Sequence, residues 1–154
     1  MNTKHIKRFN ESGENSSKNR VFLGGTCNET TWRDILIPKL KNIDYFNPIV
    51  EDWTPECQEI EMDEKENKCN IHLYVITSAM AGVFSIAEAV DSVHNIEKIT
   101  IFHVIPDGFE KSQLKSLKAV SDLIILRGGI SNIDSDLSVV VDVLNNIDEY
   151  IDEK

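Results

Sequence analysis

Short apolar runs alternate with amphipathic stretches along most of this chain. Val21 to Leu23, Ile71 to Ile76 and Ile99 to Ile105 are nearly continuous runs of apolar residues, typical of strands that are buried on both faces. Parallel strands need a crossover connection, which is usually a helix. The alternation therefore predicts an α/β fold, a mainly parallel sheet of about five strands with helices on both faces.

Local signals place the remaining elements. Tyr45 and Phe46 predict a short strand that stops at Asn47-Pro48, because Pro48 has no N–H to donate to a neighbouring strand. Thr31 and Thr54 are expected to cap helices, the second with Pro55 in its first position. Apolar spacing and stop signals predict helices over these approximate ranges: 32 to 42, 55 to 69, 84 to 94, 114 to 127 and 136 to 151.

The first twenty residues differ in composition from the rest. They are rich in Asn, Ser, Lys and Glu, and after Met1 their only sizeable apolar groups are Ile6 and Phe9. So few apolar groups do not offset the entropy lost on ordering. We expect residues 1–20 to be a disordered tail and residues 21–154 to form one domain, within the usual size of a single domain.

Charge and hydropathy exclude several classes of partner. With 16 basic and 26 acidic residues the formal net charge is −10, so the surface should repel polymeric DNA or RNA. No apolar run approaches the roughly 18 to 20 residues that a membrane helix needs, and no secretory signal is evident. We expect a cytoplasmic protein, with no membrane partner. A small nucleoside or nucleotide remains compatible, because a pocket can gather its own hydrogen-bond donors.

The cysteines and histidines show no metal-ligand pattern. Cys27, Cys57 and Cys69 are odd in number and contain no C-x-x-C pair, and the four histidines are scattered. This spacing argues against a disulfide framework and a structural zinc site. We therefore expect reduced thiols and no bound metal.

Loops at the carboxyl ends of parallel strands are the expected ligand sites. These loops are 24–31, 47–54 and 77–84. In the first, Gly24-Gly25-Thr26 lets backbone amides approach a phosphate or sugar closely. The segment lacks the Lys of a P-loop and the third Gly of a dinucleotide fingerprint, so a simple tight turn is an equal alternative.

Two interpretations compete for Ser85-Ile86-Ala87-Glu88, which follows the third loop. Ser85 and Glu88 have the spacing of a capping box, which needs no function. Alternatively, a carboxylate at the start of this helix points into the ligand crevice, where it could attack an anomeric carbon or stabilise an oxocarbenium-like centre. The spacing alone favours the cap.

A series of segments resembles the nucleoside 2-deoxyribosyltransferase family. The segments, in order, are Val21-Phe22-Leu23-Gly24-Gly25-Thr26, Thr31-Trp32-Arg33-Asp34, Tyr45-Phe46-Asn47-Pro48, Glu51-Asp52-Trp53, Tyr74-Val75-Ile76-Thr77 and Gly82-Val83-Phe84-Ser85-Ile86-Ala87-Glu88. The resemblance implies a flavodoxin-like three-layer α/β/α sandwich. It also implies that Glu88 forms a covalent bond to C1′ of the sugar.

The chain departs from the family pattern at two places. A tyrosine whose hydroxyl supports the nucleophile is usual in the first strand, where this chain has Phe22. An aspartate that protonates the base usually precedes the glutamate, whereas this loop reads Ser-Ala-Met-Ala-Gly over residues 78–82. Asp52 and Asp63 are the acids considered as replacements, and a solvated surface acid is an equal alternative for each.

The resemblance implies an enzyme that cleaves or transfers an N-glycosidic bond of a nucleoside or nucleotide, as a deoxyribosyltransferase or N-glycosidase. The alternatives are a non-catalytic nucleoside- or nucleotide-binding module and an NAD-type dinucleotide hydrolase. No metal or organic cofactor is implied, and a homo-oligomer is possible. Glu88 is the expected catalytic residue. The expected substrate-binding residues are Gly24, Gly25, Thr26, Asn47, Asp52, Asp63, Thr77, Met80, Gly82 and Ser85.

Overall fold

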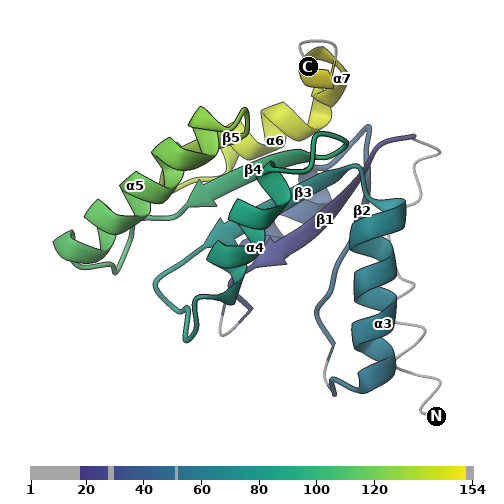
Figure 1. The fold of residues 1–154 in the computed structure, drawn as a ribbon, viewed down its shortest axis with the longest axis horizontal. Coiled ribbons are helices and arrows are strands. Elements are labelled where there is room, and N and C mark those ends of the chain that lie inside the picture. The colour runs from purple at the N-terminus through teal and green to yellow at the C-terminus, as the bar shows by residue number, and fades with distance from the viewer. Residues whose placement is uncertain (1–17, 28–29, 51, 152–154) are drawn as a thin grey trace.

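Five parallel strands form the centre of the protein. The computed structural model describes residues 18–27, 30–50 and 52–151. Its sheet has the order β2-β1-β3-β4-β5, with every neighbouring pair parallel. The strands are β1 (Arg20–Gly25), β2 (Asp44–Phe46), β3 (Ile71–Ile76), β4 (Ile99–Val104) and β5 (Ile130–Ile133). The predicted flavodoxin-like α/β sandwich is confirmed (Figure 1).

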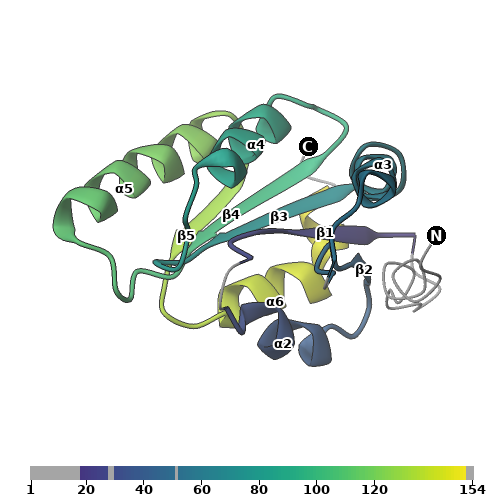
Figure 2. The same ribbon diagram turned by 90° about the horizontal axis from the view of Figure 1, so that it is seen from below.

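Helices cover both faces of this sheet. They are α2 (Trp32–Leu36), η1 (Ile37–Lys39), α3 (Pro55–Asp63), η2 (Glu64–Lys68), α4 (Phe84–Val93), α5 (Lys111–Leu126), α6 (Ser138–Asn145) and α7 (Ile147–Ile151). Helices α4 and α5 lie on one face and α2 and α6 on the other (Figure 2). Helix α3 lies beside β1 and β2 on the same face as α4 (Figure 2). The α3–η2 run and α4 are therefore neighbours on one face of the sheet, joined by a bond between Lys65 and Glu88.

Strand alternation divides the core between these layers. Phe22 and His72 are register partners on β1 and β3, as are Gly24 and Tyr74 two residues on. One core cluster packs Leu23 and its neighbours with α2, α6 and α7, and another packs Tyr74 and its neighbours with α4 and α5. A smaller cluster combines Phe22 with Phe46, Cys57 and Cys69. Because β3 and β4 are fully buried on both faces, their sequences are almost continuously apolar.

The helix predicted over residues 55–69 is present, but its last turn is a π-helix. Thr54 caps it as expected, its hydroxyl accepting a bond from the Cys57 amide at 3.4 Å. At the other end the Cys69 N–H donates to the Glu64 carbonyl at 2.7 Å, five residues back. This wider turn is η2. Thr31 precedes α2 as predicted, but its side chain makes no capping bond.

The carboxyl-terminal region also differs in detail from the prediction. The expected single helix after Ser135 is two helices, with Asn146 between them. The Asn146 side chain donates to the Asp142 carbonyl at 2.9 Å, a local bond that competes with continued helix. Strand β5 had no predicted position, since its four residues form a polar-apolar segment too short for a clear pattern.

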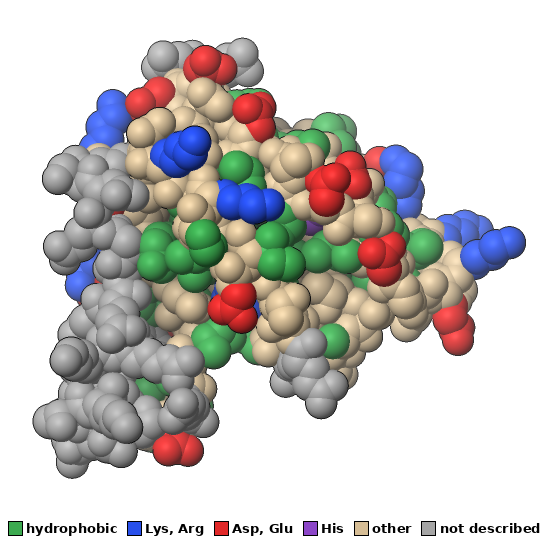
Figure 3. Space-filling model, turned by 180° about the vertical axis from the view of Figure 1, so that it is seen from behind, with side chains coloured by type: hydrophobic (Ala, Val, Ile, Leu, Met, Phe, Trp, Pro, Cys, Tyr) green, Lys and Arg blue, Asp and Glu red, His purple; other side chains and the backbone are tan. Residues whose placement is uncertain are grey.

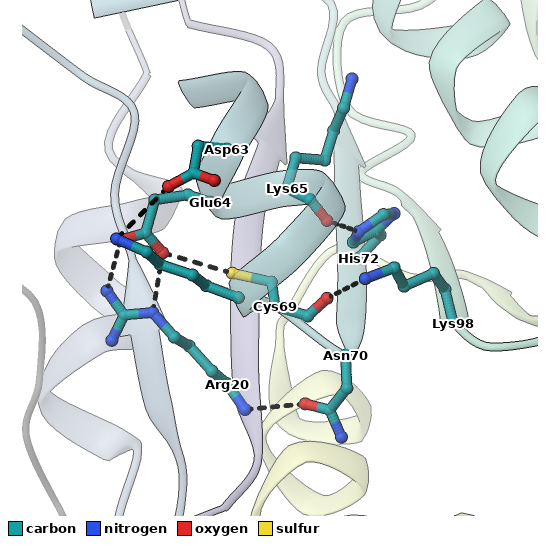
Figure 4. A network of polar contacts seen from close by, with 9 residues as sticks. Arg20, Asp63, Glu64, Lys65, Cys69, Asn70, His72 and Lys98 are labelled. Atoms are coloured by element: carbon teal, nitrogen blue, oxygen red, sulfur yellow. Dashed lines mark hydrogen bonds and ion pairs between the residues drawn. The ribbon is translucent and has the colours of Figure 1, made fainter. Parts of the chain in front are cut away.

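Polar side chains tie η2 to the amino ends of three strands (Figure 4). The Arg20 guanidinium donates to the Glu64 carboxylate at 2.9 and 3.2 Å. The Arg20 amide donates to the Asn70 side chain at 2.8 Å, and Lys98 donates to the carbonyls of Glu66 and Cys69. The end of the α3–η2 run is therefore fixed at the amino edge of the sheet.

The same contacts show where the fold begins within the expected tail. Residues 1–17 lie outside the described residues. Asn19 is 3% exposed and donates to Asp148 at 3.0 Å, and Arg20 is the first residue of β1. The last residues of the expected tail thus contribute to the domain.

We predict that deleting residues 1–17 leaves the thermal midpoint almost unchanged, because that segment carries few apolar groups. Deleting residues 1–20 should instead lower the free energy of unfolding by about 3 kcal/mol or more, because Glu64 would lose its buried partner. Thermal unfolding of both variants measures this difference. A large fall already in the chain that starts at residue 18 would contradict the prediction.

Candidate functional site

The loops after β1 and β3 are joined at the carboxyl edge of the sheet. The Thr26 amide donates to the Val75 carbonyl at 2.8 Å, and the Thr77 amide donates to the Thr26 hydroxyl at 3.0 Å. Gly25 has a φ of +110°, and a Cβ there would lie 2.2 Å from the Val75 carbonyl oxygen. Only glycine fits this approach, so the Gly-Gly-Thr turn is built into the sheet.

A cavity of about 180 Å³ opens between this turn and the start of α4. Its lining residues are Gly25, Thr26, Cys27, Ile76, Met80, Ala81, Gly82, Phe84 and Ser85. Five of them belong to the set expected from the sequence to bind substrate: Gly25, Thr26, Met80, Gly82 and Ser85. The topology therefore brings together residues from two loops that are more than fifty positions apart in the chain.

A larger cavity of about 660 Å³ lies toward the opposite face, between α2, the loop after β3 and the start of α6. Thr77 is the one expected site residue in its lining. Its charged lining residues are Lys39, Asp107 and Asp136. On this side of the molecule hydrophobic side chains lie at the surface among acidic and basic ones (Figure 3).

Arg33 is a buried cation beneath the Gly-Gly-Thr turn. Its guanidinium donates to the Leu23 carbonyl at 3.0 and 2.9 Å and to the Thr26 carbonyl at 2.8 Å. It also lies 4.1 Å from the centre of the Trp32 ring. Burial lowers the pKa of Arg33 to about 10, which still leaves it charged at neutral pH. This role was not predictable from the sequence, since a charged helical residue is normally exposed.

The structure contradicts one of the two interpretations of Glu88. Helix α4 begins at Phe84 with Val83 in the cap position, and no side chain caps it. Ser85 lies inside the helix, and Glu88 Oε2 instead accepts a bond from Lys65 Nζ at 3.1 Å. The capping-box interpretation is wrong, because both side chains are displaced from cap positions.

Glu88 belongs to a cluster of charged groups between η2 and α4. The Lys65 and Glu88 side chains are 19% and 14% exposed. Together with Tyr74 and His72 they line a small cavity of about 40 Å³. Burial and the charge of Glu88 raise the pKa of Tyr74. Burial and the same charge raise the pKa of Glu61, on α3.

A chain of buried polar groups holds the Lys65 backbone. His72 Nε2 lies 2.7 Å from the Lys65 carbonyl, which can only accept, so Nε2 carries the proton. Nδ1 then accepts from the Ser92 hydroxyl at 2.8 Å, and Ser92 lies 2.7 Å from the Thr100 hydroxyl. Burial lowers the pKa of His72 to about 4, so the ring is neutral at neutral pH. Neither His72 nor Lys65 was expected from the sequence.

The other residues expected to bind substrate lie apart from Glu88 or make local structural contacts. A Cβ on Gly24 would lie 2.8 Å from Tyr74 Cδ1, so this glycine makes room for the tyrosine ring. The Asn47 side chain accepts a bond from the Ile49 amide at 3.2 Å, and Asp52 is exposed. Asp63 is exposed and bonds Asn67 at 2.8 Å, near the amino-edge network rather than the carboxyl edge (Figure 4).

The described residues include three free cysteines and no cluster of metal ligands. Cys27 is exposed, whereas Cys57 and Cys69 are buried. Over residues 18–27, 30–50 and 52–151, no three His, Cys, Asp or Glu side chains are arranged to hold a metal ion. In the same ranges no helix is long and apolar enough to cross a membrane.

The expected lack of bound metal stays a prediction. The cysteine spacing predicts that the purified protein contains no stoichiometric zinc. Elemental analysis measures this directly, and one zinc per chain would contradict it.

We predict that His72 makes folding less favourable in acid. Its pKa is about 4 in the folded protein and about 6.5 in the unfolded chain. The neutral ring therefore contributes fully to the free energy of unfolding above pH 6.5, and this contribution is lost as the pH falls toward 4. The loss amounts to about 3 kcal/mol. Denaturant unfolding of His72→Gln should show a weaker dependence on pH over this window. His94→Gln, at an exposed position, is the control, and an unchanged slope in His72→Gln would contradict the prediction.

One comparison with known proteins gives a match. A family profile described as nucleoside 2-deoxyribosyltransferase like matches residues 18–105, more than half of the chain. The matched segment starts just before β1 and ends just after β4, so it contains the Gly-Gly-Thr turn, Lys65 and Glu88. No curated protein and no solved structure gives a significant match.

Proposed function

Because the chain belongs to the nucleoside 2-deoxyribosyltransferase-like family, we propose that it cleaves the N-glycosidic bond of a nucleoside or nucleotide, with Glu88 as the nucleophile. The observation that carries this proposal is the environment of Glu88. Its carboxylate has no capping role, is largely shielded from water and is positioned by Lys65. Shielded, positioned carboxylates are the groups that enzymes use for covalent catalysis on sugars.

The proposed reaction has two displacements at C1′. A Glu88 oxygen attacks C1′ while the base leaves with the electron pair of the C1′–N bond and gains a proton. A second base or water then attacks the glycosyl ester and regenerates the carboxylate, with overall retention of configuration. Lys65 is the only hydrogen-bond partner of Glu88 among the described residues, and it binds Oε2, which supports attack by Oε1.

Tyr74 is the phenol that we assign to support of Glu88. The first-strand position is Phe22, which stacks on Phe46 with 5.8 Å between ring centres and has no hydroxyl to offer. Tyr74 lies on the adjacent strand β3, and it lines the same small cavity as Glu88. Gly24 leaves the space that its ring fills. A hydroxyl from β3 would thus replace one from β1.

We assign the 180 Å³ cavity to part of the substrate. Ser85 lines this cavity, and Glu88 follows one turn later on α4. Residues three apart lie on the same side of a helix, so Glu88 and Ser85 belong to one face of α4. The Ser85 hydroxyl and the Thr26 hydroxyl, whose oxygen accepts a bond from the Thr77 amide, belong to residues of its wall. These are donors and acceptors suited to sugar hydroxyls.

Glu88→Gln tests the nucleophile. Glutamine keeps the shape and a hydrogen-bond acceptor for Lys65 but cannot form the glycosyl ester, so release of base should fall by about 10³-fold or more. Released base is measured by chromatography after incubation with a panel of nucleosides, nucleotides and NAD. Glu97→Gln, an exposed residue just beyond α4, is the matched control and should keep full activity.

The same panel distinguishes the other functions. If Glu88→Gln releases base as fast as the wild type, the nucleophile assignment is wrong. If the wild type binds nucleosides by calorimetry but releases no base from any member of the panel, the protein is a binding module. Cleavage of NAD alone would identify a dinucleotide hydrolase.

A further inference from the structure

Glu61 is a half-buried carboxyl group beside the Lys65–Glu88 pair that makes no ion pair or hydrogen bond of its own within the described part of the chain. It lies on α3, four residues before Lys65 in a helical run that continues into η2. Residues four apart lie on the same side of a helix. Glu61 therefore faces α4 one turn away from Lys65.

The direction of that turn places Glu61 on the entrance side of Glu88. The end of the α3–η2 run is fixed at the amino edge of the sheet by the bond between Glu64 and Arg20, so Glu61 lies nearer the carboxyl edge than Lys65 does. Helix α4 runs in the same direction and also starts at the carboxyl edge, where Ser85 lines the 180 Å³ cavity one turn before Glu88. A ligand that reaches Glu88 from this cavity passes Glu61.

Three charged groups act on Glu61, each from a different element. Glu88 on α4 is the nearby anion, while Lys65 on η2 and Arg33 on α2 are cations. Burial and the Glu88 charge outweigh the two cations, so the pKa of Glu61 is raised above its ordinary value. Glu88 is ion-paired, whereas Glu61 has no partner among the described residues. Such different environments move the pKa values of two carboxyl groups apart, so that one can serve as an acid while the other serves as a nucleophile.

We propose that Glu61 is the general acid and base of the glycosyl transfer. In the first displacement its carboxyl O–H gives its proton to a ring nitrogen of the base, as the C1′–N bond breaks toward that nitrogen and Glu88 forms the C1′–O bond. In the second, the Glu61 carboxylate takes the proton from the water or base N–H that attacks C1′, while the C1′–O bond breaks and returns its electrons to Glu88. This inference rests on the proposed function.

Other acids are less well placed for this role. A base leaves slowly as an anion, so a proton donor near the glycosidic nitrogen is needed. The loop from Ser78 to Gly82 contains no acid, and Asp63 lies by the amino-edge network. Asp91 lines the small cavity with Glu88 but comes three residues later on α4, farther from the entrance. Glu61 is the carboxyl group between the entrance and the nucleophile.

The test compares two leaving groups in Glu61→Gln. With an ordinary purine nucleoside, kcat/KM should fall by about 10²- to 10⁴-fold, the usual contribution of a general acid. With the 7-methylpurine nucleoside of the same sugar, the base is already cationic and leaves without a proton, so kcat/KM should change by less than about threefold. Glu88→Gln should lose activity on both nucleosides. Glu59→Gln changes an exposed acid on α3, the helix of Glu61, and should keep activity on both.

The pH profile gives a second readout that a purely structural role would not move. Wild-type kcat/KM for the ordinary nucleoside should decline at high pH as Glu61 loses its proton, and this decline should be absent in Glu61→Gln. Equal losses for both leaving groups, or an unchanged profile, would overturn the role of Glu61 while leaving Glu88 as nucleophile. If the wild type releases no base from either nucleoside, the proposed function fails and this inference fails with it.

Discussion

The close pairing of β1 with β3 is the constraint on which the site depends. Backbone of Gly25 approaches Val75 so closely that a methyl group would overlap its carbonyl, and one position earlier Gly24 gives its space to the Tyr74 ring. The two glycines thus let adjacent strands end side by side: the Thr26 amide donates to Val75 of β3, and the Thr26 hydroxyl accepts from Thr77 in the loop after β3. A larger residue at either glycine would push β1 away from β3, and with it the cavity wall that the turn forms.

A second constraint is the anchoring of η2. Its π-turn allows neighbouring residues to point in different directions: Glu64 reaches back to Arg20, while Lys65 reaches across to Glu88. His72 fixes the Lys65 carbonyl from below, and Lys98 fixes two other carbonyls at the end of the run. The position of the ammonium group beside Glu88 is therefore set by contacts at the amino edge of the sheet. π-turns commonly occur at such functional positions.

Features of the fold that depend on residues close together in the chain could be predicted from the sequence, and contacts between distant residues could not. The strands Ile71–Ile76 and Ile99–Val104 were predictable because burial on both faces leaves a continuous apolar pattern, and Thr54-Pro55 marked the start of α3 by a local capping bond. The Lys65–Glu88 pair was not, because its members are 23 residues apart and each resembles an ordinary surface charge in sequence. The capping-box interpretation of Ser85 and Glu88 failed for the same reason, since local spacing does not show where a helix begins when its cap is Val83.

The acidity of the chain has a different meaning at the site than over the surface. We expect the formal charge of −10 to repel polymeric nucleic acid, yet around the proposed site two cations, Arg33 and Lys65, act electrostatically on Glu61, and Lys65 forms an ion pair with Glu88. Positive and negative charges are equal in number among these four groups. Both carboxyl groups are glutamates, but Glu88 is ion-paired with Lys65 and Glu61 is not. Placing such charges out of water costs folding free energy, which the doubly buried sheet offsets. A binding module has no need for this arrangement, because hydroxyls and amides recognise a nucleoside without burying unpaired acid. Among the described residues, a carboxyl group without a partner beside an ion-paired one is consistent with the proton transfer that we propose.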